Sequence, residues 1–236
     1  MSFLKYPFWD VIKHAFSKEV WDVLLPAVWD TLYMVVLSAV ITLVLGVLLG
    51  IALSVIAKDG VRPIPFLNET AGTIVNCLRS LPQMIMIIIT LPLARILLGQ
   101  SYGVNACIIA LAASCIPMYA RLVQGALVEI PKGKIEAAKA MGSSSATIVF
   151  KVMLPEAIPS IIRGFTVALI GIISMTALAG SFGAGGIGDI AVRFGFNRFY
   201  HDMLIASVLV LIVMVEIAQI FGDMISNLIL KKRHLI

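Results

Sequence analysis

The chain has 236 residues, of which 60% are hydrophobic and 13% are charged, and its mean hydropathy is +1.03. This composition excludes a water-soluble globular protein and indicates an integral membrane protein. The net charge of +5 does not indicate a nucleic-acid binder, because the basic residues stand at the ends of apolar stretches. Cys77, Cys107 and Cys115 lack the spacing of a metal or redox site, so no metal centre is expected.

The N-terminal segment, residues 1–28, holds too many charges to cross a bilayer. It lacks the small-residue cleavage site of a signal peptide, so we do not interpret it as a removable leader. Phe8, Ile12, Phe16 and Val20 recur every four residues, which predicts one helix with an apolar ridge lying in the membrane interface. An irregular terminal arm is the alternative.

Residues 29–230 form the predicted membrane domain, followed by a basic tail at residues 231–236. Five stretches are long and apolar enough to cross a bilayer, at about 31–57, 70–98, 104–124, 158–180 and 203–230. The predicted fold class is therefore an all-α integral membrane protein with five transmembrane helices. Pro82 and Pro92 are expected to kink the second helix, because each removes a backbone donor and crowds the preceding turn.

Three of the predicted spans carry small residues on one side. Such a ridge lets the backbone of another helix approach closely, so these faces are expected to pack against protein rather than lipid. The ridges are Ser38, Thr42, Gly46, Gly50 and Ser54 in the first span, Ala106, Ala110, Ala113, Pro117 and Ala120 in the third, and Gly164, Ala168, Gly171 and Ser174 in the fourth.

A long amphipathic segment, residues 129–156, separates the third and fourth spans. Local signals predict two short helices in it: Pro131 suits a helix start, and Gly142 suits the end of the first helix. Ser143 or Ser144 would cap the second helix, which is expected to place Ile148, Val149 and Val152 toward one side and to stop at Leu154-Pro155. A membrane protein that keeps such a segment in water is expected to offer it to a partner.

A glycine-rich run, residues 183–188, follows the fourth span. It superficially resembles a phosphate-binding loop, but no strand precedes it, so the nucleotide interpretation fails on context. We predict that its glycines allow tight backbone turns at the outer mouth of a pathway.

The fifth span carries a carboxyl group, Glu216, near its middle. A charge there is expensive in lipid, so Glu216 is expected to face protein or water. Gln219, Asp223 and Asn227 continue the same side, which predicts a polar stripe directed into the bundle or a subunit interface. A structural role for Glu216 and a role in handling substrate or protons are both open.

Several motifs together resemble one family in order and spacing, the methionine-uptake permeases of bacterial ATP-binding-cassette importers. The resemblance covers about Trp29 to Leu230 and rests on Leu78-Arg79-Ser80-Leu81-Pro82, Glu129-Ile130-Pro131, Glu136-Ala137-Ala138 with Gly142, Leu154-Pro155-Glu156-Ala157 and Gly183-Ala184-Gly185-Gly186-Ile187-Gly188. It implies a type I importer permease bundle whose EAA loop, residues 129–156, is cytoplasmic. The second helix of that loop is then the coupling helix, which sits in a groove of the ATPase subunit.

The resemblance also implies roles for individual residues. Glu136 and Gly142 would hold the angle between the loop helices, and Leu154-Pro155 would pass motion into the fourth span. The residues from Ser143 to Phe150 would make the docking surface. The residues implied in coupling are Glu136, Ala137, Ala138, Gly142, Ser143, Ser144, Ser145, Ala146, Ile148, Leu154 and Pro155. Ser174, Thr176 and Leu178 are candidates for a pathway or gate, together with Glu216, although packing explains the first three equally well.

No Walker A pattern occurs in the chain, so it is predicted to be a transport subunit and not an enzyme, binding no cofactor itself. The resemblance supplies the partners: a second copy of the chain, two cytoplasmic ATPase subunits that bind ATP and Mg²⁺, and an extracytoplasmic binding lipoprotein that delivers methionine or a related small amino acid. The rival is a proton-coupled secondary transporter that uses Glu216. Against it, the chain shows no inverted repeat.

A cytoplasmic EAA loop with five spans places the N-terminus outside and the C-terminus inside the bacterial cytoplasmic membrane. This orientation puts twelve of the eighteen Lys and Arg residues on the inner side, in agreement with the positive-inside rule. They are Lys58, Arg62, Arg79, Arg121, Lys132, Lys134, Lys139, Lys151, Arg163, Lys231, Lys232 and Arg233.

Overall fold

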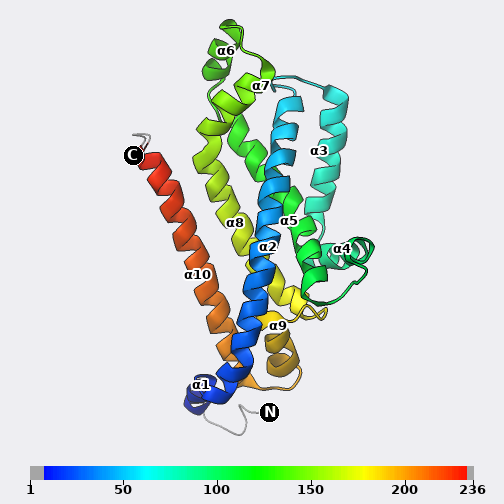
Figure 1. Cartoon of the computed structure of the whole chain (residues 1–236), viewed down its shortest axis with the longest axis vertical. Coiled ribbons are helices and arrows are strands. Elements are labelled where there is room, and N and C mark those ends of the chain that lie inside the picture. The colour runs from blue at the N-terminus through cyan, green and yellow to red at the C-terminus, as the bar shows by residue number, and fades with distance from the viewer. Residues whose placement is uncertain (1–7, 233–236) are drawn as a thin grey trace. The chain divides into compact units, whose positions relative to one another are not determined.

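The computed structural model describes residues 8–232, and every regular element in that range is helical (Figure 1). In chain order the elements are α1 (Phe8–Ala15), α2 (Lys18–Ile56), α3 (Pro65–Ser80), α4 (Gln83–Leu98), α5 (Gly103–Val128), α6 (Lys132–Ala140), α7 (Ser145–Thr147), the π-helical turn η1 (Ile148–Met153), α8 (Leu154–Gly180), α9 (Gly186–Ile190), the π-helical turn η2 (Ala191–Phe196) and α10 (His201–Lys232).

Four helical stretches in the described range are long and apolar enough to cross a membrane: Lys18–Ile56, Gly103–Val128, Ser145–Gly180 and His201–Lys231. A fifth span exists when α3 and α4 are counted together as one bent pair. The predicted second span is thus broken at Leu81-Pro82, which confirms the kink expected at Pro82. Pro92 lies inside α4 without ending it. The predicted all-α membrane fold is confirmed.

The N-terminal prediction needs correction where the structure describes the segment. The helix is interrupted at Phe16-Ser17, between α1 and α2. Helix α2 already begins at Lys18, well before the expected start of the first span at Thr31. The proposed ridge is therefore divided between two helices: the side chain of Phe16 is 61% exposed, whereas Val20 is buried. The charged residues between Lys18 and Asp22 therefore lie within the first turns of α2 and not ahead of it. Residues 1–7 of this segment lie outside the described range.

The chain divides into two compact units, and the first consists of Met1–Val40, Pro82–Ser114 and Leu169–Ala218. Within it, the start of α2 packs against α9 and the start of α10 (Figure 1). The buried residues of this cluster are Ala15, Val20, Leu24, Ala27, Ile187, Ile190 and Ala206. The region predicted to lie along the membrane surface thus buries part of its apolar side against the segment that follows α8.

The second unit consists of Ile41–Leu81, Cys115–Ala168 and Gln219–Ile236. Here the small-residue face of α2 meets α5: a Cβ on Gly46 would lie 2.5 Å from Cδ1 of Tyr119, and a Cβ on Gly50 would lie 2.7 Å from the carbonyl oxygen of Ala120. Tyr119 is fully buried, and its hydroxyl donates to the carbonyl of Ile161 on α8 at 3.4 Å. The structure confirms that the small-residue face of the first span packs against protein.

Candidate functional site

The turn between the two helices of the EAA loop is built by backbone geometry. Helix α6 ends at Ala140, and Gly142 adopts a φ of +74° that L side chains rarely occupy. The amide of Ser143 donates to the carbonyl of Ala138 at 3.1 Å, and the amide of Gly142 donates to Lys139 at 2.9 Å. These bonds are a Schellman-type cap, so the predicted role of Gly142 as a helix terminator is confirmed.

The second loop helix begins as predicted but does not end as predicted. Ser144 caps it, because its side-chain oxygen accepts from the amide of Thr147 at 3.2 Å. The helix then continues through η1 and α8 as one stretch, Ser145–Gly180, and does not stop at Leu154-Pro155. The wider turn of η1 lets Leu154 donate back to Val149, so the helix enters Pro155 without the break that a proline inside a regular helix produces. The second helix of the loop and the span that follows it therefore form one continuous helical stretch.

The coupling residues predicted from the sequence divide into an exposed set and a supporting set. The exposed set is Glu136, Ala137, Gly142, Ser144, Ser145 and Ala146. Ala138 and Ile148 are only 2% and 1% exposed, Ser143 is half-buried, and Leu154 and Pro155 are half-buried in this helical stretch. Ile148 therefore supports the loop from within and does not reach its outer surface, which corrects its expected place in a docking face.

Two large apolar side chains stand out on the exposed side of the loop. Met141 is 78% exposed and Phe150 is 60% exposed, and both lie within the otherwise largely polar exposed surface of the loop. Sequence reasoning missed Met141, because it stands at a helix end where no periodic pattern applies. Exposed apolar groups that extend from a polar segment are typical anchors for a partner surface.

Glu136, which was expected to hold the angle between the loop helices, lies on the surface of α6. It is exposed, and within residues 8–232 it makes no hydrogen bond or ion pair. The backbone bonds around Gly142 lie at the turn between α6 and α7, and a role of Glu136 in holding the angle between these helices stays a prediction. The loop is also tied down by ion pairs of Lys134 with Glu156 and of Lys132 with Asp59, the second at 3.1 Å. Because these pairs are largely exposed, they contribute little to stability.

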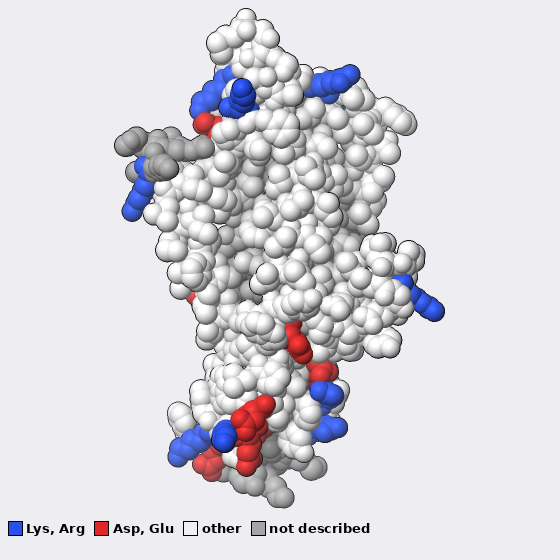
Figure 2. All heavy atoms as spheres, viewed as in Figure 1, with Lys and Arg blue, Asp and Glu red and all other residues white. Residues whose placement is uncertain are grey.

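Figure 2 shows basic side chains gathered on the visible face near the loop, above helices whose visible surface is nearly free of charge. The loop residues Lys132, Lys134, Lys139 and Lys151 are all exposed. A cluster of Lys residues beside an uncharged helical surface is the pattern expected at the cytoplasmic edge of a membrane protein.

The four pathway candidates are not equivalent in the structure. Ser174 and Glu216 line the same groove between α8 and α10, which encloses about 420 Å³. Thr176 is fully buried and donates to the carbonyl of Ile173 at 2.6 Å, so it packs within the chain. Leu178 is 38% exposed and does not line this groove. The geometry brings together Ser174 and Glu216 alone.

The polar stripe of α10 does not enter the core of its own chain. Glu216, Asp223 and Asn227 are exposed and Gln219 is half-buried, so the expectation of a stripe directed into the chain's own bundle is wrong. The amide of Gln219 donates to the carboxylate of Asp223 at 2.9 Å. In the most apolar window of this helix only 11% of residues are buried, compared with 67% for α5. A subunit interface for the stripe stays a prediction.

The glycine-rich segment is held by a residue that the sequence did not single out. Thr31 on α2 is fully buried; its hydroxyl accepts from the amide of Ile187 at 2.8 Å and donates to the carbonyl of Ala27 at 2.9 Å. Gly183, Gly185 and Gly186 all have positive φ values, which confirms the predicted tight turns. No local pattern reveals Thr31, because its partner is far away in the sequence.

This bond leads to a prediction about two buried threonines of α2. Thr31→Val removes a group that satisfies the amide of Ile187, so we expect a loss of about 1–2 kcal/mol in stability. Thr42→Val is the matched control, because the hydroxyl of Thr42 is buried without a hydrogen-bond partner in the described structure. Thermal unfolding of the two purified variants in detergent should show a lower Tm for the first variant alone. Equal Tm values would contradict the role given to Thr31.

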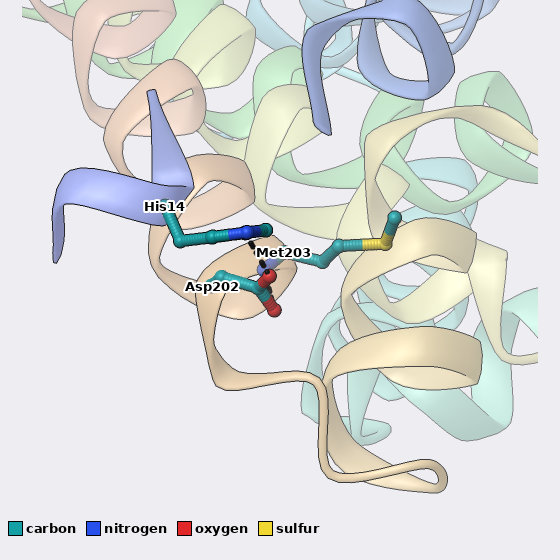
Figure 3. A network of polar contacts seen from close by, with 3 residues as sticks. All are labelled: His14, Asp202 and Met203. Carbon is teal, nitrogen blue, oxygen red and sulfur yellow. Dashed lines mark hydrogen bonds and ion pairs between the residues drawn. The ribbon is translucent and has the colours of Figure 1, made fainter. Parts of the chain in front are cut away.

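The first unit is also tied at its surface, where α1 meets the start of α10 (Figure 3). Nδ1 of His14 lies 3.1 Å from Oδ2 of Asp202, and Oδ1 of Asp202 accepts from the amide of Met203 at 2.9 Å. The side chain of His14 is 60% exposed. The contact therefore orients α1 more than it stabilises the fold.

Residues 46–233 match the family described as binding-protein-dependent transport system inner membrane component. The chain is 39% identical over 166 residues to the probable D-methionine transport system permease protein MetI of Vibrio cholerae, covering 70% of this chain and 74% of that protein. It is 42% identical over 166 residues to the methionine import system permease protein MetP of Bacillus subtilis, covering 70% of this chain and 75% of that protein.

Solved structures agree with these relatives. An inward-facing structure of the MetNI methionine ABC transporter matches with a TM-score of 0.87 and 34% identity, over 91% of this chain and 99% of that chain. A crystal structure of an amino acid ABC transporter with histidines matches with a TM-score of 0.71 and 17% identity, over 94% and 98%, which supports the fold alone. The chain belongs to the family of binding-protein-dependent transport system inner membrane components, as a multi-pass ABC permease of the methionine-importer type.

Proposed function

We propose that this permease forms the membrane pathway of an ATP-driven importer of methionine or a closely related small amino acid. The observation that carries the proposal is the solvent-exposed EAA loop, which is continuous with a membrane span over Ser145–Gly180. Methionine as the substrate is supported by the relatives about 40% identical to this chain, which are methionine transport permeases. The chain contains no Walker A pattern, so the energy has to enter from another subunit.

The proposed assembly contains two copies of this chain, two ATPase subunits that bind ATP and Mg²⁺, and an extracytoplasmic binding protein. The low burial of α10 and its exposed polar stripe support a second copy, because charged and amide groups in the middle of a lipid-facing surface are costly. The cluster of lysines at the loop supports a cytoplasmic position for it. With five spans, this position places the N-terminus outside and the C-terminus inside.

The proposed mechanism is rigid-body transmission. ATP binding closes the ATPase dimer and draws the two coupling helices together, with the exposed side chains of Met141 and Phe150 as anchors. Because α7, η1 and α8 form one helical stretch, motion of the loop moves α8 as a whole. Ser174, on the wall of the groove, lies on the same stretch. In this mechanism Gly142 sets the orientation of the anchors, and the turn of η1 keeps the helical stretch unbroken at Pro155.

The proposal is tested by uptake of labelled L-methionine into proteoliposomes that contain the permease, its ATPase and the binding protein. We expect uptake with ATP and Mg²⁺ on the ATPase side and none with ADP. Uptake driven by a proton gradient without ATP would favour the secondary-transporter alternative and overturn the proposal. A complex that hydrolyses ATP in response to the binding protein but never moves methionine would overturn the substrate assignment.

A further inference from the structure

The groove between α8 and α10 has an aliphatic wall and, within the part of the chain that the structure describes, one charged group. Its lining includes Ser174 on α8 and Glu216 on α10, and the rest of the lining is apolar, with Ile173, Ala177, Leu211 and Ile212 among it. Its volume of about 420 Å³ is that of a site for a small molecule. Among the described residues no Lys, Arg or His lines this groove, so its field favours a cation.

Glu216 has no counterion in the described part of the chain. It lies midway along α10, and within residues 8–232 it makes no hydrogen bond or ion pair. The polar residues further along α10 behave differently, since Gln219 and Asp223 are bonded to each other. An ionisable residue at the depth of the membrane core is costly and marks a functional site by default. The missing partner is therefore expected to come from outside the chain.

We propose that this groove is a transit site for apolar primary amines, in which the carboxylate of Glu216 pairs with the ammonium group of the permeant. This inference rests on the proposed function and names the chemical group of the substrate that the permease itself recognises. The aliphatic wall takes the hydrocarbon or thioether body, because burial of apolar surface favours binding at about 25 cal/mol per Å². The hydroxyl of Ser174 donates to the carbonyl of Ile170 at 3.0 Å and leaves its oxygen free to accept a hydrogen bond from the ammonium group.

A proton is a weaker candidate for the partner of Glu216. Proton transfer across a membrane needs a chain of titratable groups, and Glu216 is the one carboxylate that residues 8–232 contribute to the lining of this groove. A bare proton also gives no role to the aliphatic wall. An amine with an apolar body uses both parts of the groove.

The test compares two ligands of the same shape and different charge, 3-(methylthio)propylamine and 3-(methylthio)propan-1-ol. The labelled amine is bound at equilibrium to the permease–ATPase complex in lipid nanodiscs without the binding protein and is displaced by each unlabelled compound, with empty nanodiscs as background. We expect the amine to displace the label at a concentration roughly tenfold lower than the alcohol, which corresponds to about 1.4 kcal/mol for the ion pair. Glu216→Gln should make the two compounds equally weak, and Glu216→Asp should retain part of the preference.

Glu69→Gln is the control, since it neutralises a carboxylate whose side chain is 70% exposed and which lies on α3 outside the groove. It should leave the charge preference unchanged. Absence of saturable amine binding to the wild-type complex would overturn the proposal, as would equal displacement by both compounds or a preference that survives Glu216→Gln. If any of these results occurs together with ATP-driven methionine uptake, the amine site is refuted and the proposed function stands. If the amine binds as expected but methionine is not taken up, the proposed function is refuted and the amine site stands.

Discussion

Replacement of Gly142 by Asp is expected to separate the permease from its ATPase without unfolding it. Gly142 has a φ of +74°, and no atom lies within 4 Å of the position that a Cβ would take. The cost is therefore backbone strain alone, about 1–2 kcal/mol for an L residue in the left-handed region. The strain disfavours the turn that orients Met141 and the capped start of α7. We expect copurification with the ATPase to fall roughly five- to tenfold, with a matching loss of ATP-driven uptake.

Gly133→Asp is the control for this prediction. Gly133 lies in the first turn of α6 and has no positive φ, and a Cβ added to it would also meet no atom within 4 Å. The substitution adds the same charge to the same loop at a helix start, where an acidic residue is favourable. The amount of membrane-inserted protein should be equal for both variants and the wild type. Normal ATPase association for Gly142→Asp would show that the turn at residue 142 does not position the docking surface.

The second large effect is expected from Gly188→Ala in the first unit. A Cβ on Gly188 would lie 2.5 Å from Cα of Ala177 and 2.6 Å from the carbonyl oxygen of Thr176. The reverse contact is equally close, since a Cβ on Gly180 would lie 2.2 Å from the amide nitrogen of Asp189. The contacting atoms on both sides belong to the backbone and cannot rotate away as a side chain can. The added Cβ would therefore force α9 away from its packing contact with α8. We expect a loss of about 3 kcal/mol or more and little correctly folded protein.

Gly171→Ala, on the same helix α8, provides the comparison. Its Cβ would meet no atom within 4 Å, and the change favours a helix by up to about 1 kcal/mol. Fluorescence-detected size-exclusion chromatography of heated membrane extracts reports the fraction that remains folded for each variant. Gly188→Ala should lose its monodisperse peak at a temperature well below that of Gly171→Ala. Equal melting curves would mean that the close approach of α8 and α9 is not needed for the fold.

The sequence was sufficient to predict the all-helical membrane fold and the small-residue face of α2, because crossing a bilayer requires long apolar helices and close helix packing requires small side chains. The turn at Gly142 was also predictable, since positive φ selects glycine. The start of α2 was not predictable, because a helix can continue beyond the apolar stretch into a segment whose charged residues are solvated. The passage through Pro155 was missed because the shifted hydrogen bonds of η1 leave no mark in the sequence.

At the candidate site, the features that the sequence did not predict depend on contacts between segments that are distant in the sequence. Ile148 and Phe150 are near neighbours in an apolar pattern, yet Ile148 is buried and Phe150 is exposed. Their places depend on what packs beneath the loop, which periodicity alone does not contain. Glu216 was recognised as costly in the membrane, but the groove that it shares with Ser174 required knowledge of which face of α10 meets α8. Thr31 escaped detection for a related reason, since it bonds to a distant segment.

The most direct test of the coupling claim is ATP-driven methionine uptake by a complex in which residues 132–147, which include α6 and α7, are replaced by a flexible glycine-serine linker of equal length. The buried residues from Ile148 onward stay in place, so the membrane domain should fold and insert. The account predicts that uptake falls to the level measured with ADP, while the ATPase retains its basal hydrolysis. Wild-type uptake rates from that complex would contradict it.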